Sequence, residues 1–175
     1  MIINFYPESD KPELKKATEE YSRIWNADGQ KIVKVIEKIS GLKFKEKEIN
    51  ALVFNGVSYS IPLQLNSNQT PDNKRGALTH ELCHRLIVGN NLKFDFKYED
   101  ENWNQEVHKQ VDLILYDIWV DLYGKEFADD QVEAEGNLLK QEGISPFKVA
   151  WNWALSLTKE ERAKEFKSLI NESNL

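Results

Sequence analysis

The sequence contains a single cysteine and three histidines among its 175 residues. One cysteine cannot form a disulfide within the chain, so we expect the fold to depend on its apolar core. No uncharged run reaches the roughly 18 residues of a membrane-spanning helix, and the first residues show no basic segment followed by an apolar one. We therefore expect a cytoplasmic protein that does not associate with membranes.

An excess of positive charge is also lacking. The chain has 29 acidic and 23 basic side chains, which gives a formal net charge of −6. This balance gives no reason to expect a nucleic-acid partner. Internal repeats and low-complexity linkers are absent as well, and the composition is typical of globular proteins. At this length, a single domain over residues 1–175 is expected.

The chain does contain an HExxH run, HELCH, within the stretch GALTHELCHRLIVGN at residues 76–90. On a helix, His80 and His84 lie one turn apart on the same face, so both imidazoles can reach one metal ion. Glu81 is rotated roughly a quarter turn from His80, beside such an ion, where a general base could take a proton from water. Cys83 faces another side and is expected to be a small buried side chain. The alternative to a metal site is an amphipathic helix that contains the two histidines and the glutamate by chance.

A zinc site needs a third protein ligand, and His108 is the remaining histidine. It lies in a strongly patterned helical segment from about residue 102 to Gly124. The helical wheel of this segment has an apolar arc of Val107, Val111, Ile114, Leu115, Ile118 and Leu122. His108 lies at the edge of that arc, whereas Glu106, the carboxylate alternative, points away from it. We therefore predict one Zn²⁺ held by three histidines, with a fourth position left for water.

Asp112 lies one turn beyond His108 on the same face. A histidine that binds a metal usually donates its other N–H group to a carboxylate or a carbonyl, which fixes the orientation of the ring. Asp112 is therefore a candidate partner for one of the three histidines. The alternative is an ordinary Asp–His pair on a helix surface.

The motif THELCHRL, followed by a histidine or carboxylate on a later helix, resembles the zincin metallopeptidases, and the short chain is similar to the minigluzincins and the SprT-like proteases. The order of helix, hairpin, HExxH helix and ligand helix matches over roughly residues 30–124. The chain departs from these families at His108, where gluzincins use a glutamate, and at Arg85, where an uncharged residue is usual. The resemblance implies a helix-rich α+β fold with a zincin-like catalytic core at 30–124 and a helical extension at 125–175.

The resemblance also implies an activity: zinc-dependent hydrolysis of a peptide or protein substrate by a metal-activated water, with Glu81 as general base. It further implies an edge strand above the HExxH helix that binds extended peptide by β-addition. The segment Val57–Leu65 is the candidate, and its Pro62 could equally protect that edge from aggregation. Two alternatives remain: a zinc-containing binding or regulatory module with little peptidase activity, and a metal-free helical interaction protein.

Helices are predicted at residues 11–25 and 30–40, separated by the Ala27-Asp28-Gly29 stretch, with Gly41 as the C-terminal cap of the second. From about residue 103 the chain is predicted to be mostly helical.

Strands are predicted where the hydrophobic period changes to two. Residues 49–54 and 57–61 are expected to pair as a hairpin across Asn55-Gly56. Residues 92–98 alternate in the same way and suggest another strand or a flap. Near the C-terminus, Thr158 and Glu161 predict a capping box at a helix start, and the charged run at 159–162 is expected to be a solvated helix face.

Overall fold

The computed structural model describes residues 1–92, 102–138 and 145–173. These residues form two compact units, one of Met1–Glu37 and Leu42–Asn90 and the other of Lys38–Gly41 and Asn91–Leu175. Helices predominate and accompany a small sheet, so the predicted helix-rich α+β class is confirmed. The expectation of one domain with a core at 30–124 stays a prediction.

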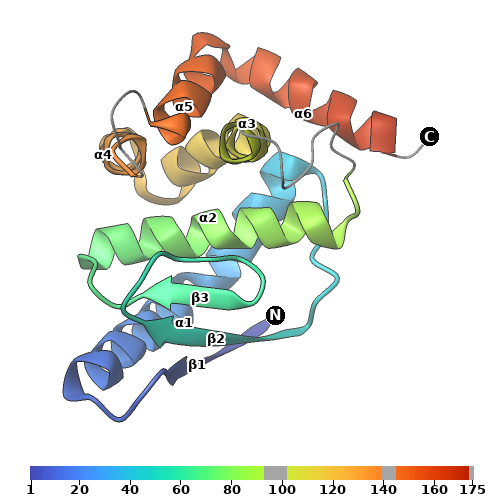
Figure 1. The fold of residues 1–175 in the computed structure, drawn as a ribbon. Coiled ribbons are helices and arrows are strands. Elements are labelled where there is room, and N and C mark those ends of the chain that lie inside the picture. Colours follow the sequence, from blue (N-terminus) through green and yellow to red (C-terminus); the bar gives the residue numbers. More distant parts are fainter. Residues whose placement is uncertain (93–101, 139–144, 174–175) are drawn as a thin grey trace. The chain divides into compact units, whose positions relative to one another are not determined.

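The first unit contains a three-stranded sheet of β1 (Ile2–Pro7), β2 (Glu48–Phe54) and β3 (Leu63–Asn66) (Figure 1). The strands lie in the order β1-β2-β3, and both neighbouring pairs are parallel. Side chains alternate between the two faces, and one face is buried. Its buried residues are Ile3, Ile49, Ala51, Val53, Leu63 and Leu65.

The helices α1 (Pro12–Ser40) and α2 (Pro71–Gly89) complete this unit, apart from the last turn of α1. The ring of Tyr21 on α1 stacks on Phe5 of β1, with centroids 6.0 Å apart. The Tyr21 hydroxyl donates a hydrogen bond to the carbonyl of Asn66, at 2.9 Å. Tyr21 therefore joins α1 to both outer strands of the sheet.

The predicted break between two N-terminal helices is wrong, because α1 continues through Ala27-Asp28-Gly29 as one helix of 29 residues. Gly29 has a packing role: a Cβ atom there would come within 2.7 Å of the Trp25 side chain. A glycine lets the indole lie directly against the helix backbone, and this contact offsets the weak helix propensity of glycine. The predicted end of the helix at Gly41 is confirmed, with a φ of +73° that suits glycine.

The predicted hairpin is also wrong. Both sides of β2 are occupied by parallel strands, so β2 cannot pair with the residues that follow Asn55-Gly56. Those residues instead return along the outer edge of β3, where Tyr59 and Gln64 exchange backbone hydrogen bonds of 2.9 and 2.8 Å in antiparallel orientation. The segment does lie at a sheet edge, as Pro62 predicted, but through a bridge rather than a full strand.

The second unit is helical in its described part (Figure 1). Its helices are α3 (Trp103–Tyr123), α4 (Lys125–Gly136), α5 (Pro146–Ser156) and α6 (Lys159–Ser173). The helix α3 contacts the other three, and Trp119 packs against Trp151 of α5 with ring centroids 5.5 Å apart. The predicted apolar arc of α3 is buried, except that Val107 is half-buried.

The predicted capping box at the start of α6 is confirmed. The Thr158 backbone N–H donates to the Glu161 carboxylate at 2.7 Å, and the Glu161 N–H donates to the Thr158 hydroxyl at 3.2 Å. The prediction of a solvated face at 159–162 is wrong for Arg162, whose guanidinium binds both carboxylate oxygens of Asp117 on α3 at 2.9 to 3.1 Å. Both side chains are buried. Their burial is possible because the two opposite charges neutralise each other.

The strand or flap predicted at 92–98 falls almost wholly outside the described residues. Across the three described ranges, every helix is either too short or too polar to cross a bilayer.

Candidate metal-binding site

The HExxH run lies in the middle of α2, as predicted. The Thr70 hydroxyl caps the helix by accepting a hydrogen bond from the Asn73 N–H at 3.2 Å, and Pro71 occupies the first turn. Beyond the cap, α2 has a buried apolar face that consists of Leu78, Leu82 and Leu86. Cys83 is completely buried, as expected. Packing thus fixes α2 on several sides and orients the polar residues between these positions.

His80 and His84 point their Nε2 atoms toward each other, 2.8 Å apart. Their ring centroids are 4.8 Å apart with a tilt of 34°, and His80 is buried while His84 is half-buried. Two imidazoles that bind one tetrahedral zinc, at Zn–N distances of about 2.0–2.1 Å, hold their nitrogens about 3.3 Å apart. The observed pair is close to that separation, so a small opening of the rings would fit it to two corners of a zinc site.

Glu81 follows His80 on α2 and is 8% exposed. Burial raises the pKa of Tyr21 above its usual range, and the charge of Glu81, and then that of Glu20, raises it further. Tyr21 therefore stays protonated and serves as the hydrogen-bond donor to Asn66. The carboxylate of Glu81 is withdrawn from bulk water next to the histidine pair, where it could act as a proton acceptor.

The sequence analysis did not identify Lys74 of α2 as a buried residue. Lys74 is 2% exposed, and its Nζ donates to the Glu20 carboxylate on α1 at 2.5 Å and lies 5.5 Å from the centre of the Tyr21 ring. The spacing of Lys74 could have indicated its burial, because Lys74, Leu78 and Glu81 share one helical face. This ion pair fastens the first half of α2 to α1, and so helps to orient the helix that carries the histidines.

Replacing Glu20 by glutamine should lower the free energy of unfolding by about 3 kcal/mol, because it leaves the buried Lys74 ammonium without its charged partner. The hydrogen bond from Lys74 holds the pKa of Glu20 below its usual value of 4.5. A carboxyl whose pKa is lowered on folding stabilises the fold above its unfolded-state pKa, and loses this effect as the pH falls through its folded-state pKa. The destabilisation should therefore be complete above about pH 4.5 and shrink below it.

Denaturant unfolding at pH 7 and at pH 3 measures this effect. The matched control is Glu19→Gln, the same chemical change at the exposed neighbouring position, which should alter stability by less than about 0.5 kcal/mol. Equal losses in the two variants would contradict a special role for the Glu20–Lys74 pair.

His108 lies near the start of α3 and is 7% exposed. Its Nδ1 is 2.5 Å from the backbone carbonyl oxygen of Asn104. A carbonyl can only accept a hydrogen bond, so Nδ1 carries the proton and the neutral ring keeps its lone pair at Nε2. The ring also packs on Phe147 of α5, with centroids 4.2 Å apart. His108 is thus held in the tautomer that binds a metal through Nε2.

Glu106, the alternative ligand, is half-exposed on the surface of α3. Its carboxylate accepts hydrogen bonds from Lys109, at 2.7 Å, and from Gln105, at 3.0 Å. These contacts agree with the helical wheel, which turned Glu106 away from the apolar arc. Asp112 is completely buried on α3. The Nδ1 group of His108 already donates to the Asn104 carbonyl, so His108 does not need Asp112 as its acceptor. The predicted role of Asp112, as a hydrogen-bond acceptor for a ligand histidine, stays a prediction.

Comparisons of the chain with models of protein families, with curated proteins and with solved structures found no match. Any function must therefore be inferred from the residues of the site and their chemistry.

Proposed function

We propose that this protein is a zinc-dependent metallopeptidase, with His80, His84 and His108 as ligands and Glu81 as general base. The observation that carries the proposal is the histidine pair of α2, whose Nε2 atoms face each other at 2.8 Å beside a buried glutamate. His108 is the remaining histidine of the chain, and we take it as the third ligand. The tautomer of His108 adds support, because its Nε2 lone pair is available to a cation.

Zinc bound there would supply Lewis-acid chemistry, by polarising the scissile carbonyl and lowering the pKa of a water molecule. Glu81 would take a proton from a water molecule at the histidine pair, and the oxygen of that water would add to the carbonyl carbon. The C–N bond then breaks, and Glu81 passes the proton to the leaving amine. The reaction consumes one water, and Glu81 ends as it began, ionised.

The proposed substrate is a peptide or protein bound in extended form along the Val57–Leu65 segment. The bridge between Tyr59 and Gln64 supports this assignment, because it places the segment at the outer edge of β3. The predicted cytoplasmic location stays a prediction.

Purified protein should contain about one zinc per chain and should cleave a mixed peptide library. A chelator should abolish the cleavage, and added zinc should restore it. The double variant His80→Ala, His84→Ala should lose both zinc and cleavage, because it lacks the paired imidazoles. Metal analysis by native mass spectrometry and peptide mapping measure these outcomes.

Full zinc content in the double variant would contradict the assigned ligands. A library left intact by the zinc-loaded wild type would contradict the peptidase and favour a zinc-containing binding module instead.

A further inference from the structure

Arg85 follows His84 directly on α2, and its side chain reaches the turn that precedes β3. The Nη1 group donates a hydrogen bond to the carbonyl oxygen of Ser60 at 2.5 Å. The Nε group donates to one carboxylate oxygen of Glu46 at 3.1 Å, and Nη2 donates to the other. The Arg85 side chain is only 11% exposed. One guanidinium therefore joins the HExxH helix to two separate loops.

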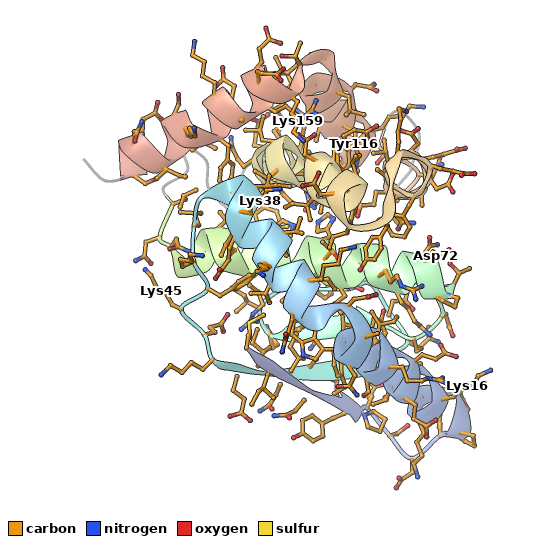
Figure 2. The ribbon with its side chains drawn as sticks, turned by 180° about the vertical axis from the view of Figure 1, so that it is seen from behind. Lys16, Lys38, Lys45, Asp72, Tyr116 and Lys159 are labelled. Carbon is orange, nitrogen blue, oxygen red and sulfur yellow. The ribbon has the colours of Figure 1, made fainter. Side chains whose placement is uncertain are left out.

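The loop that carries Glu46 has a second contact with the end of α2. Glu46 lies in the loop between α1 and β2, and the side chain of Asn90, just after α2, donates to the carbonyl of Lys43 in that loop at 3.0 Å. Figure 2 labels Lys45 on the same loop, beside the C-terminal half of α2, whereas Asp72 marks the opposite end of the helix. The bidentate contact with Glu46 thus fixes the plane of the guanidinium, and this plane aims Nη1 at Ser60.

The stretch that Arg85 contacts, Val57–Pro62, is the first part of the proposed peptide-binding segment Val57–Leu65. Its alternate side chains Val57, Tyr59 and Ile61 are 51%, 57% and 57% exposed, so they add little packing to hold it in place. Its contacts with β3 include the backbone bonds between Tyr59 and Gln64 and a bond from the Asn66 N–H to the Ser58 hydroxyl at 3.1 Å. An edge with so little packing depends on polar contacts for its position.

We propose that Arg85 is a positioning residue that fixes the Val57–Pro62 segment against α2 and thereby sets where an extended peptide lies relative to the histidine pair. This inference rests on the proposed peptidase function. Arg85 does not touch the reacting atoms, so its loss should weaken peptide binding and leave the chemical step unchanged. A preformed edge binds a strand more tightly than one that must first be ordered.

Steady-state kinetics of the zinc-loaded protein, with a peptide that the wild type cleaves, tests this role. Arg85→Met removes the charge-assisted hydrogen bonds that position the peptide-binding segment, and it leaves the groups of the chemical step unchanged. Its KM should therefore rise about tenfold, and its kcat should stay within about twofold of the wild-type value. Arg85→Lys keeps the charge but not the bidentate fork, so its KM should lie between those of Arg85→Met and the wild type. Glu46→Gln should also raise KM, because it loosens the guanidinium.

The matched control is Arg75→Met on the same helix, where the arginine pairs with Asp72 of α2 and with Asp28 of α1. Its KM should equal that of the wild type. Amide hydrogen exchange provides a readout that needs no activity: the backbone N–H groups of Tyr59 and Gln64 should exchange faster in Arg85→Met than in the wild type or in Arg75→Met.

An unchanged KM in Arg85→Met would overturn the inference, and so would a loss of kcat together with zinc, which would indicate a structural role. Unchanged exchange at Tyr59 and Gln64 would overturn it as well. Failure of the proposed function is seen separately, as an intact peptide library or as equal cleavage by the wild type and Glu81→Gln. The exchange measurement then still decides whether Arg85 holds the segment.

Discussion

Replacing Glu81 by glutamine should leave zinc bound and lower kcat by roughly 10²–10⁴-fold. Glutamine matches glutamate in size, so the packing around this buried position should persist. Its amide cannot take a proton from water, and this is the step assigned to Glu81. Because the residue is not a proposed ligand, zinc content and thermal stability should stay close to those of the wild type. Digestion of a mixed peptide library by both proteins, side by side, measures the effect.

Two controls accompany this comparison. Zinc analysis of Glu81→Gln shows whether the metal is retained, and a thiol reagent tests Cys83, which is completely buried and should react slowly with little loss of activity. Equal cleavage by the two proteins would contradict the general-base role. If neither protein cleaves while both hold zinc, a binding or regulatory module is the better description.

Replacing His108 by alanine should weaken zinc binding by more than the roughly 10–100-fold that is typical for loss of a residue behind a ligand. The reason is the fixed tautomer: the Asn104 carbonyl holds the proton on Nδ1, so the Nε2 lone pair of His108 is ready to bind a cation. Competition with a chromophoric chelator at constant pH measures the zinc affinity.

Glu106→Ala is the matched control, because Glu106 is the other candidate ligand on the same turn of α3. Its carboxylate is already bound by Lys109 and Gln105, so the change should alter zinc affinity little. Asp112→Asn should weaken zinc binding by about 10–100-fold if Asp112 orients a ligand histidine. If Glu106→Ala lost zinc while His108→Ala kept it, the third ligand would be a glutamate, as in the gluzincins that the motif resembles.

Features that depend on a few neighbouring residues were predicted from the sequence. The HExxH helix, the burial of Cys83 and the end of α1 at Gly41 are all confirmed. So is the capping box between Thr158 and Glu161. In each case the deciding interactions lie within about one or two helical turns, where periodicity and capping rules apply.

The pairing of the sheet could not be predicted in this way. The turn signal at Asn55-Gly56 indicated a hairpin, but β2 lies between β1, which the sequence analysis missed, and β3. In the parallel register Ile3 lies opposite Ile49, which is far away in the sequence. A local turn preference amounts to a fraction of the stability that a strand gains by burying one face, so the core decided the partners.

The partners of the buried charged residues could not be predicted from the sequence either. The partner of Lys74 is 54 residues away, that of Arg162 is 45 residues away, and that of Arg85 is 39 residues away. A helical wheel treats a lone charge as a surface residue, because it cannot include a partner on another element.

By itself, therefore, the sequence determined which residues could bind a metal, since two histidines and a glutamate at this spacing share one helix whatever surrounds it. Only the tertiary structure decided how those residues are held. It showed the Phe147 ring on α5 against which His108 packs and the guanidinium of Arg85 that joins α2 to Ser60. Both partners lie on other elements of the chain, which the periodicity of a single helix cannot identify.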